Sequence, residues 1–197
     1  MNRREALKST ALLGGTAVVS TSLLTLLQSC QQQPRLGWQP QFLSVDHAQL
    51  ISSLVDTMLP TTDTPGGLDV KVDLFIDLVF AKTMEEEAKK QKVAEMDEFN
   101  EMCAARFGKV FHQLDADQKK TILQDEESNS PTFNGGVWGT AVGEQEPVGF
   151  YRSLKSMAIW AYCSSEEIGK NVLNYDPIPG PFKGCIPFSD VGKVWSL

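Results

Sequence analysis

Residues 46–59 read DHAQLISSLVDTML, and this stretch decides the class of fold. Its apolar residues recur every three or four positions, the spacing that places side chains on one face of an amphipathic α-helix. They are Leu50, Ile51, Leu54, Val55, Met58 and Leu59. Asp46 is of a residue type that caps helix starts, and Pro60 ends the helix because proline lacks the N–H that a helix interior needs.

The same helical spacing recurs along most of the remaining chain, whereas strand patterns are scarce. Further helices are expected at residues 69–83, from 85 to about 111, after a cap at Asp115, at 148–162, and as a short helix after Ser164 or Ser165. We therefore expect an all-α fold, a bundle of about five helices.

Two segments depart from this pattern. Residues 125–149 contain a Gly-rich run at 131–143 and predict irregular structure. Residues 174–197 are rich in Pro and Gly but keep the large apolar side chains Phe188 and Trp195. We expect this C-terminal arm to lie across its own domain or across a partner.

The N-terminus has the order of an export signal. Arg3 and Arg4 precede an uncharged stretch that ends at Ser29, and Cys30 follows directly. The run around the two arginines resembles a twin-arginine signal, although Ala6 stands where Phe is usual. Residues 27–30 resemble a lipobox, which predicts lipidation of Cys30. The alternative is a permanent transmembrane anchor, which the Gly, Ser and Thr residues of the stretch disfavour.

These observations divide the chain into three parts. We expect a lipoprotein signal peptide at 1–29, a lipidated tether at 30–45, and a single helical domain at 46–197 that ends in the arm 174–197. The expected location is the periplasmic face of a bacterial membrane, reached by the twin-arginine route, which carries chains that are already folded.

Composition and motifs exclude several classes of function. The formal net charge is -7, and residues 1–29 are net positive, so the acidic excess lies in the rest of the chain and disfavours nucleic acid as a partner. The two histidines, His47 and His112, lie outside any metal-ligand spacing, so no metal site is expected. No dinucleotide-binding or nucleophile-elbow pattern is present. We expect no catalytic residue.

Lipidation of Cys30 leaves an odd number of cysteines, which are Cys103, Cys163 and Cys185. At least one is then free or paired with another chain. Cys103 and Cys163 lie among apolar residues of expected helices, whereas Cys185 lies in the arm. Cys185 is the candidate for a disulfide to another chain, and a disulfide between Cys185 and Cys163 is the alternative.

Two motifs resemble signatures of a known family. The first is MLPTTDTPG at residues 58–66, followed by Val72 and by the run 75–77. The second joins Tyr162 to YDPIPG at residues 175–180 and ends at Cys185. Together they resemble the gluconate 2-dehydrogenase subunit 3 family over nearly the whole chain after the signal.

The resemblance implies a non-catalytic small subunit that assembles with a large flavoprotein dehydrogenase of the glucose-methanol-choline type. Such a complex oxidises sugars, sugar acids or alcohols, carries FAD in the large subunit, and often passes electrons to a cytochrome c subunit with haem c. The twin-arginine signal then exports both subunits together. We expect the partner interface to lie in the arm, at Tyr175, Asp176, Pro177, Pro179, Gly180, Phe182, Cys185 and Trp195.

Two other classes of function stay open. One is a stand-alone envelope lipoprotein that binds a small ligand or another envelope protein. The other is an enzyme that uses Asp63, Asp69 and Asp73, although these carboxylates fit helix caps and first turns better than an acid-base pair.

Overall fold

The computed structural model describes residues 37–133, 136–137, 140–141, 147–178, 180–181 and 184–196. The chain divides into two compact units, 1–37 and 38–197, and the helices described here belong to the second. The expected signal peptide and the lipidation site at Cys30 lie outside the described residues. No helix among the described residues is long and apolar enough to cross a membrane.

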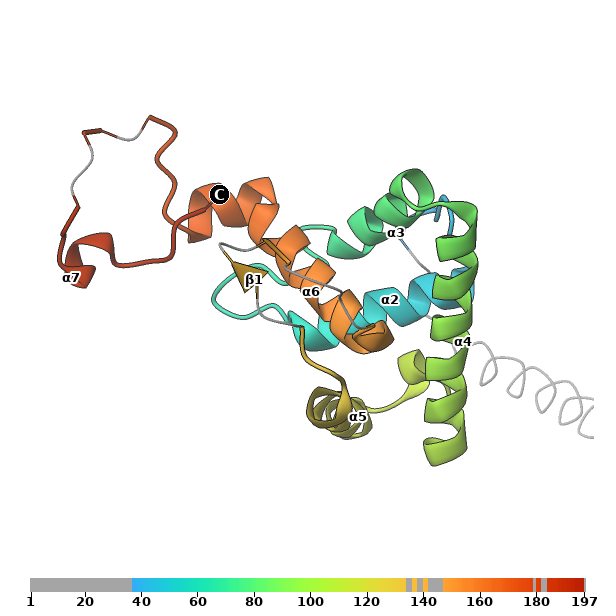
Figure 1. Cartoon of the computed structure of the whole chain (residues 1–197). Coiled ribbons are helices and arrows are strands. Elements are labelled where there is room, and N and C mark those ends of the chain that lie inside the picture. The colour runs from blue at the N-terminus through green and yellow to red at the C-terminus, as the bar shows by residue number, and fades with distance from the viewer. Residues whose placement is uncertain are drawn as a thin grey trace, which may run out of the picture. The chain divides into compact units, whose positions relative to one another are not determined.

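The fold is all-α, as predicted (Figure 1). Its five long helices are α2 (Val45–Met58), α3 (Val72–Thr83), α4 (Glu86–Phe107), α5 (Ala116–Asn129) and α6 (Gly149–Ser164). Shorter elements are the 3-10 helix η1 (Phe111–Gln113), the π-helix η2 (Ile168–Val172) and the four-residue helix α7 (Phe188–Val191). Within the expected irregular segment, β1 (Gly136–Val137) pairs antiparallel with β2 (Thr140–Ala141).

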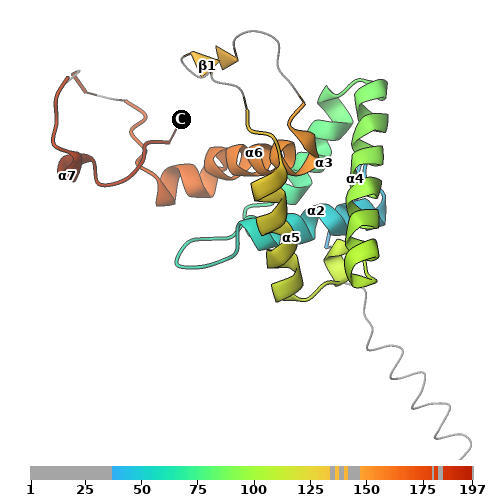
Figure 2. The same cartoon turned by 60° about the horizontal axis from the view of Figure 1, so that its bottom comes forward.

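Helix α2 forms the centre of the bundle. It packs against α3, α4, α5 and η1, and α6 covers α3, α4 and α5 (Figure 2). The predicted apolar face of α2 is confirmed, because Leu50, Ile51, Leu54 and Val55 are fully buried. The other large buried side chains come from every neighbouring helix. They include Ile76, Phe80, Met96, Phe111, Ile122 and Leu154.

Several helix ends differ from the prediction. Ser44 caps α2, because its side chain accepts a hydrogen bond from the amide of His47, and Asp46 lies in the first turn. Helix α4 ends at Phe107, because Gly108 adopts a left-handed conformation with φ 71°, so the segment around Phe111 forms η1 and not a continuation of the helix. The predicted cap at Asp115 is confirmed as a capping box.

The expected short helix after Ser164 or Ser165 is the π-helix η2. Neither serine caps it: Ser165 is the C-cap of α6 and donates its hydroxyl to the carbonyl of Tyr162 at 2.7 Å.

A charged cluster joins α5 to α6 at the base of the irregular segment. Glu127 accepts hydrogen bonds from Lys155 at 2.5 Å, Arg152 at 2.8 Å and the hydroxyl of Tyr151 at 3.1 Å. The bonds from Lys155 and then Arg152 lower the pKa of Glu127 to about 2. Arg152 also donates to the carbonyl oxygens of Glu127, Ser130 and Pro131. Its positive charge offsets the partial negative charge of the carbonyl groups at the C-terminal end of α5.

Two buried aspartates of α3 hold the segment that precedes α2. Asp77 is 2% exposed and accepts the backbone N–H groups of Gln41, Phe42 and Leu43 at 2.6, 3.1 and 2.8 Å. Asp73 accepts the indole N–H of Trp38 at 3.1 Å and the hydroxyl of Ser52 at 2.6 Å. Residues 38–43 are bound to α3 in this way, and the second compact unit begins at Trp38.

Candidate partner interface

The C-terminal arm, residues 174–196, is a closed loop. The amide of Asn174 donates to the carbonyl of Val194 at 2.9 Å, and the amide of Ser196 donates to the carbonyl of Asn174 at 2.8 Å. These bonds form a parallel bridge between Asn174 and Trp195. Figures 1 and 2 show the arm as a loop that stands off the bundle beyond η2.

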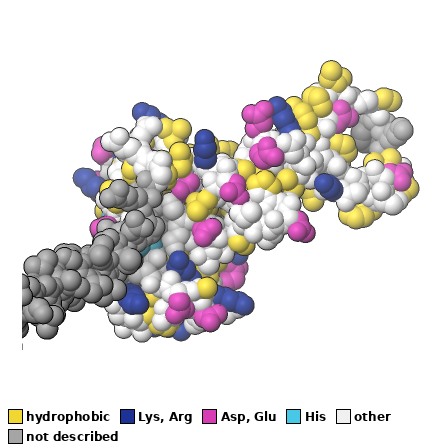
Figure 3. Space-filling model, turned by 180° about the vertical axis from the view of Figure 1, so that it is seen from behind, with side chains coloured by type: hydrophobic (Ala, Val, Ile, Leu, Met, Phe, Trp, Pro, Cys, Tyr) yellow, Lys and Arg dark blue, Asp and Glu magenta, His cyan; other side chains and the backbone are white. Residues whose placement is uncertain are grey.

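The arm presents large apolar side chains to solvent. Ile178 is 85% exposed, Phe188 82% and Val194 75%, and Tyr175, Ile186 and Trp195 are each about half exposed. The space-filling view shows hydrophobic side chains gathered along this part of the domain (Figure 3). Large apolar side chains exposed together on one segment make the arm a candidate binding surface for another macromolecule.

The structure places most of the predicted interface residues on this loop. Tyr175, Asp176, Pro177, Gly180, Cys185 and Trp195 are all exposed. Pro179 and Phe182 lie outside the described residues. The carboxylate of Asp176 accepts the amide of Ile178 at 3.3 Å, which is a local turn that leaves the neighbouring side chains exposed.

Sequence reasoning missed three apolar residues of the arm as interface candidates, namely Ile178, Ile186 and Val194. Their signal was present, because each is a β-branched apolar residue in a Pro- and Gly-rich segment without helical or strand spacing. Without such spacing the sequence indicates no face of the arm that packs on the domain, and all three side chains are exposed.

The three described cysteines are free thiols in very different surroundings. Cys103 is buried, and burial raises its pKa to about 11. Cys163 is half-buried and Cys185 is exposed. The alternative disulfide between Cys185 and Cys163 is not formed in this structure, which leaves the Cys185 thiol open to another chain.

The first family-like motif forms a tightly held loop between α2 and α3. Asp69 accepts the hydroxyl of Thr61 and the amide of Gly66, each at 2.7 Å, and these two bonds lower its pKa. A Cβ atom on Gly66 would lie 2.6 Å from the Thr61 nitrogen, and one on Gly67 would lie 2.6 Å from Val55 Cγ1. Only glycine fits these two positions without a shift of the loop.

Tyr162 brings the two motifs together. Its hydroxyl donates to the carbonyl oxygen of Pro65 at 2.7 Å and lies 3.4 Å from the hydroxyl of Thr64. In Figures 1 and 2 the loop after α2 reaches toward the end of α6 from which η2 and the arm continue. Motifs that are nearly a hundred positions apart in the chain therefore lie at one end of the domain.

Two of the three aspartates of the rival enzyme hypothesis, Asp69 and Asp73, have structural roles. Asp69 holds the loop, Asp73 is buried against Trp38 and Ser52, and Asp63 is exposed. Among the described residues there is no group of three or more His, Cys, Asp or Glu side chains placed to hold a metal ion.

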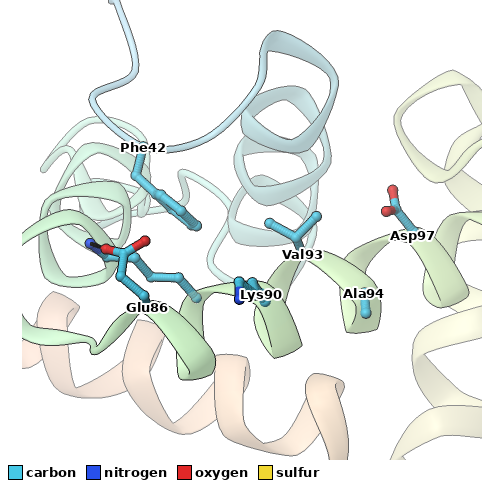
Figure 4. Close-up of a pocket in the computed structure, with 7 residues that line it drawn as sticks. Phe42, Glu86, Lys90, Val93, Ala94 and Asp97 are labelled. Carbon is cyan, nitrogen blue, oxygen red and sulfur yellow. Dashed lines mark hydrogen bonds and ion pairs between the residues drawn. The ribbon is translucent and has the colours of Figure 1, made fainter.

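A shallow depression of about 380 Å³ lies where the segment before α2 crosses α4. Figure 4 shows Phe42 reaching toward α4, with Glu86 and Lys90 on one side, Val93 and Ala94 on the helix surface and Asp97 at the far end. Its charges are engaged locally, because Glu86 pairs with Lys89 at 2.8 Å and Asp97 with His47 at 2.8 Å. These pairs favour a solvated helix face over a specific ligand site.

Comparison with known proteins gives one match. The family model described as gluconate 2-dehydrogenase subunit 3 matches residues 45–180, which include the first motif, the second motif as far as Gly180, and the five long helices. No curated protein and no solved structure matches the chain.

Proposed function

Because the chain belongs to the gluconate 2-dehydrogenase subunit 3 family, we propose that it is a non-catalytic subunit of a flavin-dependent dehydrogenase complex. The large subunit would be a glucose-methanol-choline-type flavoprotein that carries FAD and oxidises a sugar, sugar acid or alcohol. A cytochrome c subunit with haem c would accept the electrons.

The observation that carries this proposal is the exposed apolar arm of a chain that belongs to this family. The described residues hold no cluster of metal-binding side chains. Ile178, Phe188 and Val194 are more than 70% exposed, which is unfavourable for a protein that works alone in water. A partner that covers these side chains removes this apolar surface from water. Binding to the folded, FAD-loaded dehydrogenase only would also stabilise that subunit.

The proposal includes the export of the complex and its attachment to the membrane. The Arg3-Arg4 signal would export the two subunits together as a folded pair, and the lipid on Cys30 would hold the complex at the periplasmic face of the membrane. Replacement of both arginines by lysine should leave both subunits in the cytoplasm. Replacement of Cys30 by Ser should release the complex from washed membranes, and a variant that stays membrane-bound would overturn the lipid anchor.

The test of the complex is a mild-detergent purification of the tagged, full chain from its native membranes, with a visible spectrum and identification of the proteins that co-purify. We expect a flavin spectrum and a large dehydrogenase. A band that splits into two chains only with reductant, and that is lost in a Cys185→Ser variant, would show that Cys185 forms a disulfide to the partner.

A pair of matched variants connects this result to the arm. Phe188→Ser removes a side chain that is 82% exposed on the arm, whereas Phe133→Ser removes one that is 53% exposed within the irregular segment 125–149. The dehydrogenase should be lost from the Phe188→Ser preparation and retained by the Phe133→Ser preparation. Equal recovery with both variants would contradict docking through the arm.

A further inference from the structure

The closure of the arm is centred on Asn174, whose backbone and side chain both take part in it. Besides its two backbone hydrogen bonds, Asn174 donates its side-chain amide to the carbonyl oxygens of Val191 and Lys193, the latter at 2.8 Å. Both acceptors are carbonyls, so the Nδ2 group must face them and the side chain has only one suitable orientation. The carbonyl of Asn174 also accepts the hydroxyl of Ser196 at 3.1 Å.

These bonds span the whole arm, because they connect its first residue with residues 191–196. The helix α7 in the described part of the arm has four residues, and none of them is buried. The far end of the arm lies beside the domain at Ser196, which is half-buried and whose Cβ atom is 3.8 Å from the position that a Cβ atom on Gly169 of η2 would take.

From this geometry we infer that Asn174 is a positioning residue that holds the arm closed in the shape that docks on the dehydrogenase. The inference rests on the proposed function and adds a mechanism to it. A chain that is ordered before binding loses less conformational entropy on binding than one that must be ordered by its partner. The Asn174 closure therefore raises affinity although Asn174 itself need not touch the partner.

The closure also fixes the kind of surface that the arm fits. It holds both ends of the loop together, so Tyr175 and Val194, from opposite ends of the arm, belong to one docking element together with Ile178 and Phe188. The complementary surface is an apolar groove on the flavoprotein that receives aliphatic and aromatic side chains.

The experiment compares three full-chain variants in mild detergent with the wild type. Asn174→Ala removes the side-chain donors, and Asn174→Asp keeps the shape but directs a carboxylate at two carbonyl oxygens. Asn171→Ala is the matched control, an exposed asparagine on η2. Two readouts are needed: hydrogen exchange of the Ser196 amide in the isolated protein, and affinity for the co-purifying dehydrogenase after it has been freed of its native subunit.

We expect both Asn174 variants to exchange the Ser196 amide at least about tenfold faster and to bind at least about tenfold more weakly, which corresponds to about 1.4 kcal/mol. The helical content and melting temperature of the bundle should stay unchanged, because the closure lies outside the core. The Asn171→Ala variant should match the wild type in both readouts.

Three results would overturn the inference in distinguishable ways. Unchanged exchange of the Ser196 amide would show that Asn174 does not close the arm. Fast exchange with unchanged affinity would show that closure does not matter for docking. If the wild type itself binds no dehydrogenase, the proposed function fails and this inference fails with it, whatever the exchange data show.

Discussion

Replacement of Asp77 by Ala tests the reasoning about the start of the domain. Asp77 is 2% exposed and accepts three backbone N–H groups, of which that of Leu43 is buried with it. Hydrogen bonds to a charged group contribute about 1.5–3 kcal/mol each, and a buried donor left without a partner costs about 1–3 kcal/mol. Removal of the carboxylate also relieves its own desolvation, which offsets part of this loss.

The net expectation is a loss of about 2–4 kcal/mol in the free energy of unfolding. For a chain of 197 residues this corresponds to a fall of roughly 5–15 °C in melting temperature, measured by circular dichroism. Hydrogen exchange of the amides of residues 41–43 should accelerate together. The control is Asp63→Ala, since Asp63 is exposed in the loop after α2, and it should change stability by less than about 0.5 kcal/mol. Equal stability of the two variants would refute the assigned role of Asp77.

Three further predictions concern groups elsewhere in the domain. In the folded protein a soluble maleimide should label the exposed Cys185 within minutes. The buried Cys103, whose pKa is raised to about 11, should stay unlabelled until denaturant is added. Mass spectrometry measures the labelling of both residues, and early labelling of Cys103 would contradict its burial. The pKa of Glu127 is lowered from 4.5 to about 2, so its ion pairs stabilise the fold above about pH 4.5 and are lost as the pH falls toward 2. Glu127→Gln should therefore lower the melting temperature at pH 6, and the difference from the wild type should shrink toward pH 2. A difference that stays constant with pH would contradict this prediction. Tyr162→Phe removes the hydrogen bond to the Pro65 carbonyl and should destabilise the protein by about 0.5–1.5 kcal/mol in urea unfolding. Hydrogen exchange of the Gly67 amide should become faster. Unchanged exchange in this loop would argue against the link between the two motifs.

The sequence predicts the bundle well because the buried faces of its helices have the helical period. Residues 46–59 contain enough evenly spaced apolar side chains to specify α2 to within a residue at either end. Helix ends are harder, because Ser44 and Asp46 are both good caps and only the backbone geometry selects between them. The end of α4 is set by the left-handed conformation of Gly108. The sequence alone does not show which glycine adopts a positive φ angle.

Buried polar residues are outside the reach of this kind of reasoning. Aspartates such as Asp73 and Asp77 usually lie on a solvated helix face. Both are buried in this protein because residues 38–43 fold back on them. The closure of the arm is similar, since Asn174 pairs with backbone groups about twenty positions later and backbone groups carry no sequence signal. The composition of the arm indicates large apolar side chains without a helical or strand face, and these side chains are exposed, whereas the shape in which the arm is held was not predictable.

The most direct test of the central claim is the absorbance spectrum of the tagged chain purified in mild detergent from its native membranes. The account predicts a flavin spectrum that belongs to a large dehydrogenase bound in fixed ratio to this chain. A colourless preparation that contains this chain alone would contradict the claim, and the chain would then share only the fold of the gluconate 2-dehydrogenase subunit 3 family.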